Sequence, residues 1–244
     1  MPEKQSPEQA SRARRVLIVD IGGTSVKFLV ARPGLRRAGV RQVTKFKSGD
    51  ALTPDVMMKQ LLEVTRDWRY DVVSLGYPGV VRAGRITREP HNLGRGWISF
   101  DFRAAFGRPV RILNDAAMQA IGAYRGGTML FLGFGTGLGS ALIVDGTVVP
   151  MELGHLHCSR KHTYESRVGE HARKRFGLAK WRREVVAVVR GFSQALLPDD
   201  IVLGGGEVKH LKRLPPHTRR GDNNDAFLGG VRQWSVMKKR SRCA

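Results

Sequence analysis

The amino-acid sequence predicts an α/β protein made of two related halves, and two observations carry this prediction. The stretch VLIVDIGGTSVKFLVA, residues 16–31, and the stretch FLGFGTGLGSALIV, residues 131–144, share one plan: an apolar strand, a Gly/Thr turn and a second apolar strand. Alternating helical and strand patterns follow each hairpin, as in an α/β fold. Turns of this kind present backbone N–H groups to anions, so we expect one phosphate-binding turn in each half.

In the first half, hydrophobic periodicity and turn residues define the elements. The helix expected after the hairpin begins at Pro54, a first-turn position where the missing N–H of proline is tolerated. The predicted elements of this half are strands at 16–20, 25–31, 40–46, 71–76 and 110–113, helices at 54–68 and 116–124, and a Gly/Pro/Arg-rich loop over 77–97.

The second half repeats this scheme with its own hairpin. The predicted elements are strands at 128–133, 140–145 and 200–203, an irregular segment over 150–162, helices at 163–176 and 180–196, a triple-glycine turn and a last helical region. The expected organisation is a basic flexible tail over 1–15, a small N-terminal lobe over 16–113 and a larger C-terminal lobe over 114–224. A C-terminal helix near 225–244 is a candidate to pack back on the N-terminal lobe.

Composition limits the class of protein and of partner. The 244 residues include 42 Lys and Arg against 21 Asp and Glu, a net charge of +21 that attracts polyanions. Only Cys158 and Cys243 are present, which excludes a disulfide framework and favours the reducing cytoplasm. The N-terminus has no apolar signal segment. Residues 126–144 carry no charge but contain six glycines, so they are interpreted as two strands around a turn and no membrane partner is expected.

The two glycine turns carry residues suited to phosphoryl transfer. Asp20 ends a strand before the first turn, where a carboxylate can hold Mg²⁺ through water; capping the turn is the alternative. A plain tight hairpin would explain either turn alone, but the duplication favours two jaws that clamp a phosphate chain. Lys27 either reaches a phosphate or is a solvated strand lysine. The residues expected to contact the donor phosphates are Gly22, Gly23 and Thr24 in the first turn and Gly135, Thr136 and Gly137 in the second.

Two other nucleotide-binding classes are disfavoured by the spacing of the glycines. The pattern G-x-x-x-x-G-K-[ST] of P-loop enzymes is absent, and the alternating glycines of residues 133–139 do not fit G-x-G-x-x-G.

Asn114 and Asp115 lie where a strand ends and a helix begins, so both can project into a cleft. Asp115 is the candidate general base for an attacking hydroxyl, although an N-cap of the following helix explains it equally well from the residues alone.

Several motifs in order resemble the ROK sugar kinases, a family of the actin-like ATPase superfamily. They are VDIGGTSVK (19–27), NDA (114–116), GFGTGLGSALIVDG (133–146), ELGH (152–155) and VLGGG (202–206), with further similarity in KHTYESRVGE (161–170) and GDNNDAFLGGVRQW (221–234). The resemblance implies a two-lobed actin-like ATPase (ribonuclease H-like) fold. It also implies a cytoplasmic homodimer that transfers a phosphoryl group, with Mg²⁺, from polyphosphate or ATP to the 6-hydroxyl of glucose.

The same resemblance assigns individual residues. It makes Asp115 the catalytic base and places the donor beside Gly204, Gly205 and Gly206. The residues that it assigns to the sugar are Asn92, Asn114, Asp115, Glu152, His155 and Glu165. Taken singly, Asn92 would be a turn residue, Glu165 a solvated helix residue and His155 a structural histidine.

The sequence departs from the family pattern in two places. Many ROK proteins follow ELGH with a C-x-C-G-x₄-C zinc site, whereas this chain has only Cys158 there, so we expect no structural zinc. The segment 148–155 is also one residue shorter than usual, which leaves the placement of Glu152 open.

The prediction of the phosphoryl donor rests on the distribution of Lys and Arg along the chain. Residues 152–190 hold ten Lys and Arg against four Asp and Glu, and residues 205–244 hold ten against three, so a basic track from the cleft would suit polyphosphate. The alternative is that these are solvated helix faces and a basic tail, in a strictly ATP-dependent glucokinase or a kinase of another hexose. A ROK-type repressor is disfavoured because about fifteen residues precede the first strand, and a catalytically inactive nucleic-acid-binding protein would have no need of Asp20, Thr24 and Asp115 together.

Overall fold

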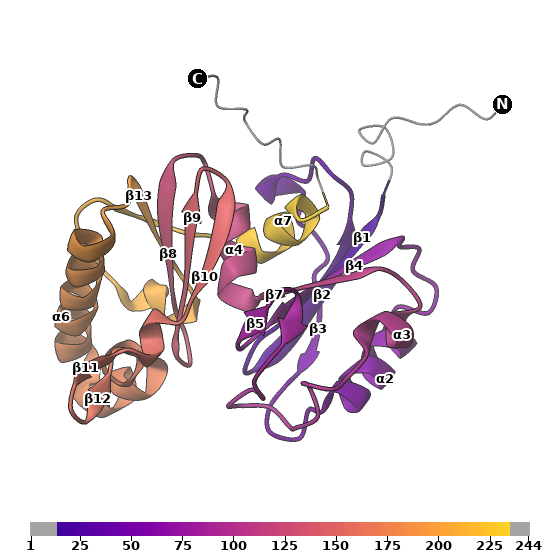
Figure 1. The fold of residues 1–244 in the computed structure, drawn as a ribbon, viewed down its shortest axis with the longest axis horizontal. Coiled ribbons are helices and arrows are strands. Elements are labelled where there is room, and N and C mark those ends of the chain that lie inside the picture. The colour runs from indigo at the N-terminus through magenta and orange to yellow at the C-terminus, as the bar shows by residue number, and fades with distance from the viewer. Residues whose placement is uncertain (1–13, 235–244) are drawn as a thin grey trace.

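The computed structural model describes residues 14–234 and contains two five-stranded sheets (Figure 1). The first sheet has the order β3-β2-β1-β4-β7, and the second has the order β10-β9-β8-β13-β14. The strands of the first sheet are β1 (Val16–Ile21), β2 (Ser25–Ala31), β3 (Thr44–Lys47), β4 (Val72–Tyr77) and β7 (Val110–Asn114). Those of the second are β8 (Thr128–Phe134), β9 (Leu138–Val144), β10 (Thr147–Met151), β13 (Asp200–Gly204) and β14 (Thr218–Arg220).

The two sheets share one topology, which confirms the predicted duplication. In each sheet the first three strands of the half form an antiparallel meander, and the fourth and fifth strands run parallel to the first. All six residues of β1 are buried because helices or loops cover both faces of a central strand. The strand β2, one place from the edge, mixes buried and partly buried residues.

Helices and short segments connect and cover the strands (Figure 1). The α-helices are α2 (Pro54–Val64), α3 (Phe102–Phe106), α4 (Asp115–Ala123), α5 (Glu165–Val168), α6 (Glu170–Leu196) and α7 (Asp225–Arg232). The 3₁₀ segments are η1 (Arg37–Gly39), η2 (Leu153–His155) and η3 (Gly206–His210), and the two short hairpins are β5 (Val81–Arg82) with β6 (Arg85–Ile86) and β11 (His157–Ser159) with β12 (His162–Thr163).

Helices α4 and α7 cross between the two sheets (Figure 1). They approach closely because glycines line the crossing: a Cβ on Gly122 would collide with the backbone of Asp225, and one on Gly229 with the carbonyl of Met118. On its other side α7 packs against β1 and β4, where the Ser74 hydroxyl donates to the Gly230 carbonyl at 2.6 Å. An ion pair of 2.6 Å joins buried Asp225 to Arg37 of the N-terminal half. Thus α7 follows the second sheet in sequence and contacts the first.

Several predicted boundaries differ from the structure. The third strand begins at Thr44 rather than at residue 40. Val40 and Val43 lie outside any strand and pack against the core cluster that includes Phe227 of α7, and Gln42 between them has a positive φ of 54°. The first helix ends at Val64, after which Trp68 turns inward against the Phe28 ring. The elements that sequence reasoning did not place are α3, β5, β6, β10, β11, β12 and β14.

Other boundaries differ in the second half. The break predicted between the two helices of 163–196 corresponds to the non-helical Gly177 inside α6, whereas the first of them is further divided at Gly169. The last helical region ends at Arg232, and most of the predicted tail 1–15 and the segment 235–244 lie outside the described residues.

Candidate active site

The predicted catalytic residues lie at the carboxyl ends of the parallel strands of the first sheet. Asp20 near the end of β1 pairs with Gly76 of β4, and Asn114 at the end of β7 pairs with Tyr77. A Cβ on Gly76 would lie 3.5 Å from the Asp20 carboxylate and would require the end of the Met118 side chain to move. In open α/β sheets this edge is where ligands bind.

Two carboxylates with raised pKa values occupy this edge. Asp20 is 9% exposed, and burial raises its pKa to about 6, against the opposing effect of Lys27. For Asp115, burial first and then the charges of Asp20 and Glu152 raise the pKa to about 7, although the Ala116 N–H donates to its Oδ1 at 2.8 Å. A carboxylate with a pKa near neutrality is suited to accept a proton.

Asn114, not Asp115, is the N-cap of α4. Its Oδ1 accepts the Ala117 N–H at 3.1 Å, and its Nδ2 donates to the Gly79 carbonyl at 3.0 Å. Each end of the amide therefore has one structural partner, which leaves one N–H and one lone pair for a sugar hydroxyl. The helix begins at Asp115, one residue earlier than predicted.

The first glycine turn is held by one bond within its own backbone and one from a distant serine. The Gly22 N–H donates to the Ser25 carbonyl at 3.0 Å, and the Ser48 hydroxyl donates to the Gly22 carbonyl at 2.6 Å. The Gly22 amide is thus not available to a donor, contrary to the expectation that all three residues offer N–H groups. Thr24 is exposed. Lys27 is the cross-strand neighbour of Asp20, so the side chains of Lys27 and Asp20 lie on the same face of the hairpin.

The second glycine turn is held from behind by α5 and α6. The Gly135 N–H closes the turn on the Gly137 carbonyl at 3.0 Å, and the Gly135 carbonyl accepts the Glu170 N–H at 2.9 Å. Glu165 lies against Gly137 and accepts the Leu138 N–H at 3.0 Å. The Gly135 amide is therefore engaged, as in the first turn.

The two turns lie next to each other. A Cβ on Gly23 would be 3.3 Å from the Thr136 hydroxyl oxygen and 3.9 Å from the Asn92 side chain. Because Gly23 belongs to the first half and Thr136 to the second, this contact brings together the two turns that the sequence predicts as opposing jaws. It also brings Asn92 of the long loop to the same place.

The remaining predicted sugar residues form a connected group in the second half. His155 Nδ1 lies 3.7 Å from Glu152 Oε2, at the end of η2. Burial raises the pKa of Glu152, and His155 opposes this shift while Glu165 adds to it. Since the charge of Glu152 also raises the pKa of Asp115, Glu152 lies within electrostatic range of the candidate base.

The triple glycine lies directly behind the second turn. Gly204 pairs with Gly133 of β8. Gly205 has a φ of 85°, and a Cβ there would collide with the backbone of Phe134, the residue before the turn. Only glycine allows this approach.

Arg88 and His91 are two site residues that sequence reasoning missed. Both lower the pKa of Glu152, and the His91 and His155 rings meet edge to face with centroids 6.1 Å apart. They lie in the loop over 77–97, where no periodicity predicts side-chain direction. The resemblance that assigns Asn92 points to the stretch HNLGRGW (91–97), which begins at His91, and this was the one signal that could have found it; Arg88 lies outside that stretch.

A model of the ROK family matches residues 16–170. The chain belongs to the ROK family. The polyphosphate glucokinase of Mycobacterium tuberculosis (strain ATCC 25618 / H37Rv) is 31% identical over 232 residues, which cover 88% of this chain and 86% of that protein. The glucokinase of Pyrobaculum calidifontis is 25% identical over 149 residues, 59% of this chain and 48% of that protein.

Solved structures show that this ROK chain has the fold of sugar kinases. The inorganic polyphosphate/ATP-glucomannokinase from Arthrobacter sp. strain KM has a TM-score of 0.77 at 24% identity, over 91% of this chain and 99% of that one. A ROK family glucokinase from Streptomyces griseus, in complex with glucose and AMPPNP, has a TM-score of 0.73 at 16% identity, over 90% and 98%. The predicted two-lobed actin-like ATPase fold is therefore confirmed.

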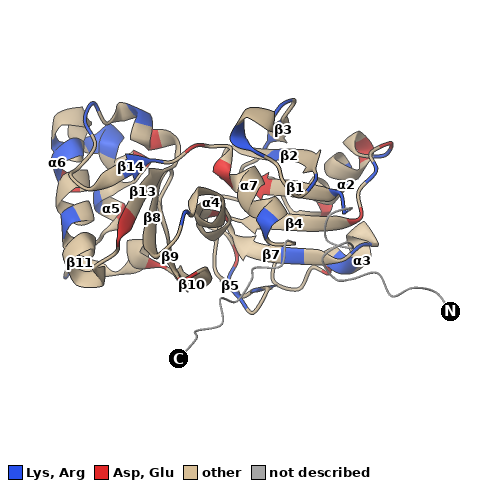
Figure 2. Cartoon of the chain, turned by 90° about the horizontal axis from the view of Figure 1, so that it is seen from above, with Lys and Arg blue, Asp and Glu red and all other residues tan. Residues whose placement is uncertain are grey.

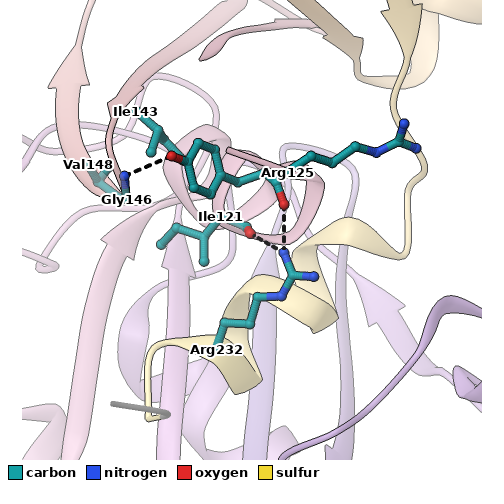
Figure 3. Close-up of a pocket in the computed structure, with 7 residues that line it drawn as sticks. Ile121, Arg125, Ile143, Gly146, Val148 and Arg232 are labelled. Atoms are coloured by element: carbon teal, nitrogen blue, oxygen red, sulfur yellow. Dashed lines mark hydrogen bonds between the residues drawn. The ribbon is translucent and has the colours of Figure 1, made fainter. Parts of the chain in front are cut away.

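One pocket of this ROK chain, of about 280 Å³, lies away from the glycine turns, between α4, α7 and the turn from β9 to β10 (Figure 3). Arg232 of α7 donates there to the Ile121 carbonyl at 2.7 Å and the Gly122 carbonyl at 2.9 Å, which caps the last turn of α4. The Gly146 N–H donates to the Tyr124 hydroxyl at 2.8 Å. The residues that line this pocket therefore join α4, α7 and the turn from β9 to β10 by hydrogen bonds.

Within residues 14–234, no helix has the length and apolar character needed to span a membrane.

Proposed function

We propose that this ROK protein transfers a phosphoryl group from polyphosphate, and also from ATP, to the 6-hydroxyl of glucose. The observation that carries the proposal is the contact between the two glycine turns, Gly23 beside Thr136, above a carboxylate edge where the pKa of Asp115 is about 7. Relatives named polyphosphate glucokinase and glucokinase support the sugar and the donor.

In this proposal each part of the site has one task. Asp115 accepts the proton of the glucose 6-hydroxyl as that oxygen attacks the terminal phosphorus of the donor. Asn114, already fixed by the helix cap and by Gly79, orients a neighbouring hydroxyl with its free N–H and lone pair. The backbone amides of Gly23 and Gly137 and the hydroxyls of the two threonines bind the donor phosphates.

Asp20 and Asp115 fit a divalent cation. Both supply hard carboxylate oxygens, both are largely buried, and both have pKa values raised by the cost of burying negative charge. A cation at this edge would lower both pKa values and lessen that cost. We propose that Asp20 holds Mg²⁺ through water, which when bound would neutralise charge on the donor phosphates.

The remaining sugar contacts of the proposal come from both halves of the chain. Asn92 lies at the turn contact, and Glu152, His155 and Glu165 form the connected group behind it. Glu165 has a second task, since it holds the Gly137 turn through the Leu138 N–H. Its replacement would therefore disturb both sugar and donor.

A basic surface beside the second turn supports the choice of donor. Lys and Arg gather on α6 (Figure 2), and the N-terminus of α6 holds the Gly135 turn through the Glu170 N–H. We call six exposed cations of this region the α6 surface; they are Arg175, Lys180, Arg183, Lys209, Lys212 and Arg213. Among residues 14–234 none of the six forms a salt bridge, although Arg175 and Lys180 lie over the Phe176 ring. A polyphosphate chain that leaves the turns along α6 would meet these cations, whereas ATP would reach few of them.

The experiment is a donor comparison on purified protein with glucose in excess and glucose 6-phosphate as the measured product. We expect long polyphosphate to have a lower KM than tripolyphosphate, because a longer chain contacts more cations at once. Raising the salt concentration should weaken polyphosphate use more than ATP use. Activity with ATP alone would contradict the polyphosphate proposal and favour a strictly ATP-dependent kinase.

A pair of matched variants separates the α6 surface from net charge. Lys212→Gln with Arg213→Gln removes two cations from the surface, whereas Lys59→Gln with Arg103→Gln removes two exposed cations from α2 and α3. We expect the first pair to raise the KM for long polyphosphate several-fold and to leave ATP unchanged. Equal effects of both pairs would mean that the α6 surface is only a solvated face.

Three further expectations belong to this proposal. The protein is expected to be a homodimer in the cytoplasm, with no nucleic-acid partner. Gel filtration with light scattering measures the first, and a mass of one chain would contradict it. A nucleic-acid mobility-shift assay at physiological salt measures the last.

A further inference from the structure

An arginine-rich pocket lies at the end of the first sheet opposite to the active site. It has a volume of about 460 Å³ and draws on three separate segments of the chain. Arg15 precedes β1, Arg66 and Arg69 follow α2, and Arg108 precedes β7. Because β1, β4 and β7 are parallel, the pocket lies at their amino ends, whereas Asp20 and Asn114 lie at or next to carboxyl ends.

The positive charge of this pocket is almost uncompensated. Its only acidic lining residue is Asp71, whose carboxylate accepts the main-chain N–H of Arg15 at 2.6 Å. Among the described residues no salt bridge involves any of its four arginines, and the acidic residues nearest in sequence, Glu63 and Asp67, form none either. One guanidinium, that of Arg108, donates to the adjacent Gly107 carbonyl at 3.3 Å.

The pocket has a rigid wall. Trp68 and Tyr70 line it and also pack against the main hydrophobic core of the first half, where the Trp68 ring lies 5.7 Å from that of Phe28. The buried Thr65 hydroxyl donates to the Leu61 carbonyl at 2.8 Å and closes the end of α2. The position of this wall is therefore fixed by the core, and the four arginines line the same pocket.

A helix C-terminus attracts cations and explains one arginine after α2. It does not explain why two more segments bring Arg15 and Arg108 to the same hollow, since like charges repel. An anion that carries several charges would relieve this repulsion, and guanidinium groups bind phosphate oxygens in pairs. The volume of about 460 Å³ lies within the range of small-molecule sites.

We infer that this pocket is a second binding site, separate from the active site, for an anion that contains three or more linked phosphate groups. The inference stands on the arginines and the cavity, and it is independent of the proposed function. The strand β1 has six residues, so the pocket is about 20 Å from the first glycine turn at about 3.3 Å per residue. A short anion cannot occupy both places.

Two sources share this chemistry: inorganic polyphosphate and the triphosphate of a nucleotide. Trp68 and Tyr70 line the pocket, so a nucleotide base could contact them and the two sources differ in expected affinity. Tripolyphosphate, ATP and AMP are the probes that distinguish them. Tighter binding of ATP than of tripolyphosphate identifies a nucleotide site, equal or weaker binding identifies a polyphosphate site, and AMP should bind far more weakly than either.

The test is hydrogen–deuterium exchange of the full chain with millimolar tripolyphosphate. We expect protection of residues 65–71 and 106–110, separate from any protection of residues 22–25 and 135–138 in the active site. Failure of the proposed function would remove only the active-site protection. Failure of this inference would remove only the protection at the arginine-rich pocket.

Variants assign the binding to the arginines. Arg66→Gln with Arg69→Gln should weaken binding at this pocket by about tenfold for each guanidinium lost. Lys59→Gln with Arg103→Gln removes the same charge from the same half and should leave it unchanged. Arg108→Gln gives a second test if the double variant does not fold. No protection at the pocket, or equal weakening by the control pair, would overturn the inference.

Discussion

Replacing the candidate base should stabilise the fold at alkaline pH. Burial and two neighbouring carboxylates raise the pKa of Asp115 from its ordinary value of 3.8 to about 7. The folded state therefore binds this proton more tightly than the unfolded state, and its stability falls as pH rises from about 4 to about 7. Each pKa unit is about 1.4 kcal/mol, which sets a ceiling of about 4 kcal/mol on the cost of the ionised side chain at pH 8.

Asp115→Asn removes this cost and keeps the oxygen that accepts the Ala116 N–H. Because Asp115 retains some exposure, we expect the variant to be more stable by about 1–3 kcal/mol at pH 8 and by less than about a third of that at pH 4.5. Urea unfolding at both pH values, in EDTA so that no cation offsets the charge, measures the difference. Asp67→Asn, an exposed aspartate outside the site, should show no such pH dependence. A destabilised variant, or an equal gain at both pH values, would show that the ionised Asp115 side chain does not carry this cost.

Four further outcomes test the site and the fold. Asp115→Asn should bind glucose normally but lower turnover by about 10²–10⁴, the usual contribution of a general base; near-normal turnover would reassign Asp115 to the helix terminus. EDTA should abolish activity but lower the melting temperature only by the small contribution of Mg²⁺ at the two carboxylates, because no zinc holds the fold; one tightly bound zinc per chain would contradict this. Gly23→Ala should raise the donor KM at nearly constant stability, since its Cβ would lie 3.3 Å from the Thr136 hydroxyl; an unchanged KM would separate the turns from the donor. Gly122→Ala should cost more than about 3 kcal/mol in urea unfolding, because its Cβ would meet the Asp225 backbone.

The sequence predicts the hairpin strands well because their signals are local. Ser25–Ala31 is found with the predicted bounds, since a glycine turn precedes it and a proline follows shortly after. The duplicated strand order follows from the repeated plan of the two halves. In contrast, β10 and β14 are edge strands whose pairing depends on where β9 and β13 come to lie, so no local pattern marks them.

Helix boundaries are less predictable because they depend on caps and on packing. The predicted start of α4 was one residue late, because a cap side chain at Asn114 and one at Asp115 are equivalent in sequence. The five-residue α3 is too short for periodicity, although Asp101 caps its start and Gly107 ends it with a φ of 58°. Both signals are visible in sequence only once the position of a helix is known.

Some features of the candidate site can be predicted from the sequence and others cannot, as for the fold. The glycine turns and Asp115 carry motifs with fixed spacing, so sequence reasoning reaches them. The burial that raises the pKa of Asp115, the engagement of the Gly22 and Gly135 amides, and the approach of Arg88 and His91 to Glu152 all arise from contacts between distant segments. Such contacts leave no trace in spacing.

The cost of burying charge at the carboxylate edge also explains why the two turns are so firmly held. Asp20 and Asp115 destabilise the folded state when ionised, so the site would relax if the backbone around it were free to move. The Ser48 hydroxyl fixes the first turn and the Glu170 N–H fixes the second, and neither bond uses a residue proposed to contact sugar or to act as base. The structure thus holds the carboxylates in an unfavourable environment that a cation and a proton donor relieve. Weakening either support, for example by Ser48→Ala, should therefore reduce turnover even though Ser48 contacts no substrate in this proposal.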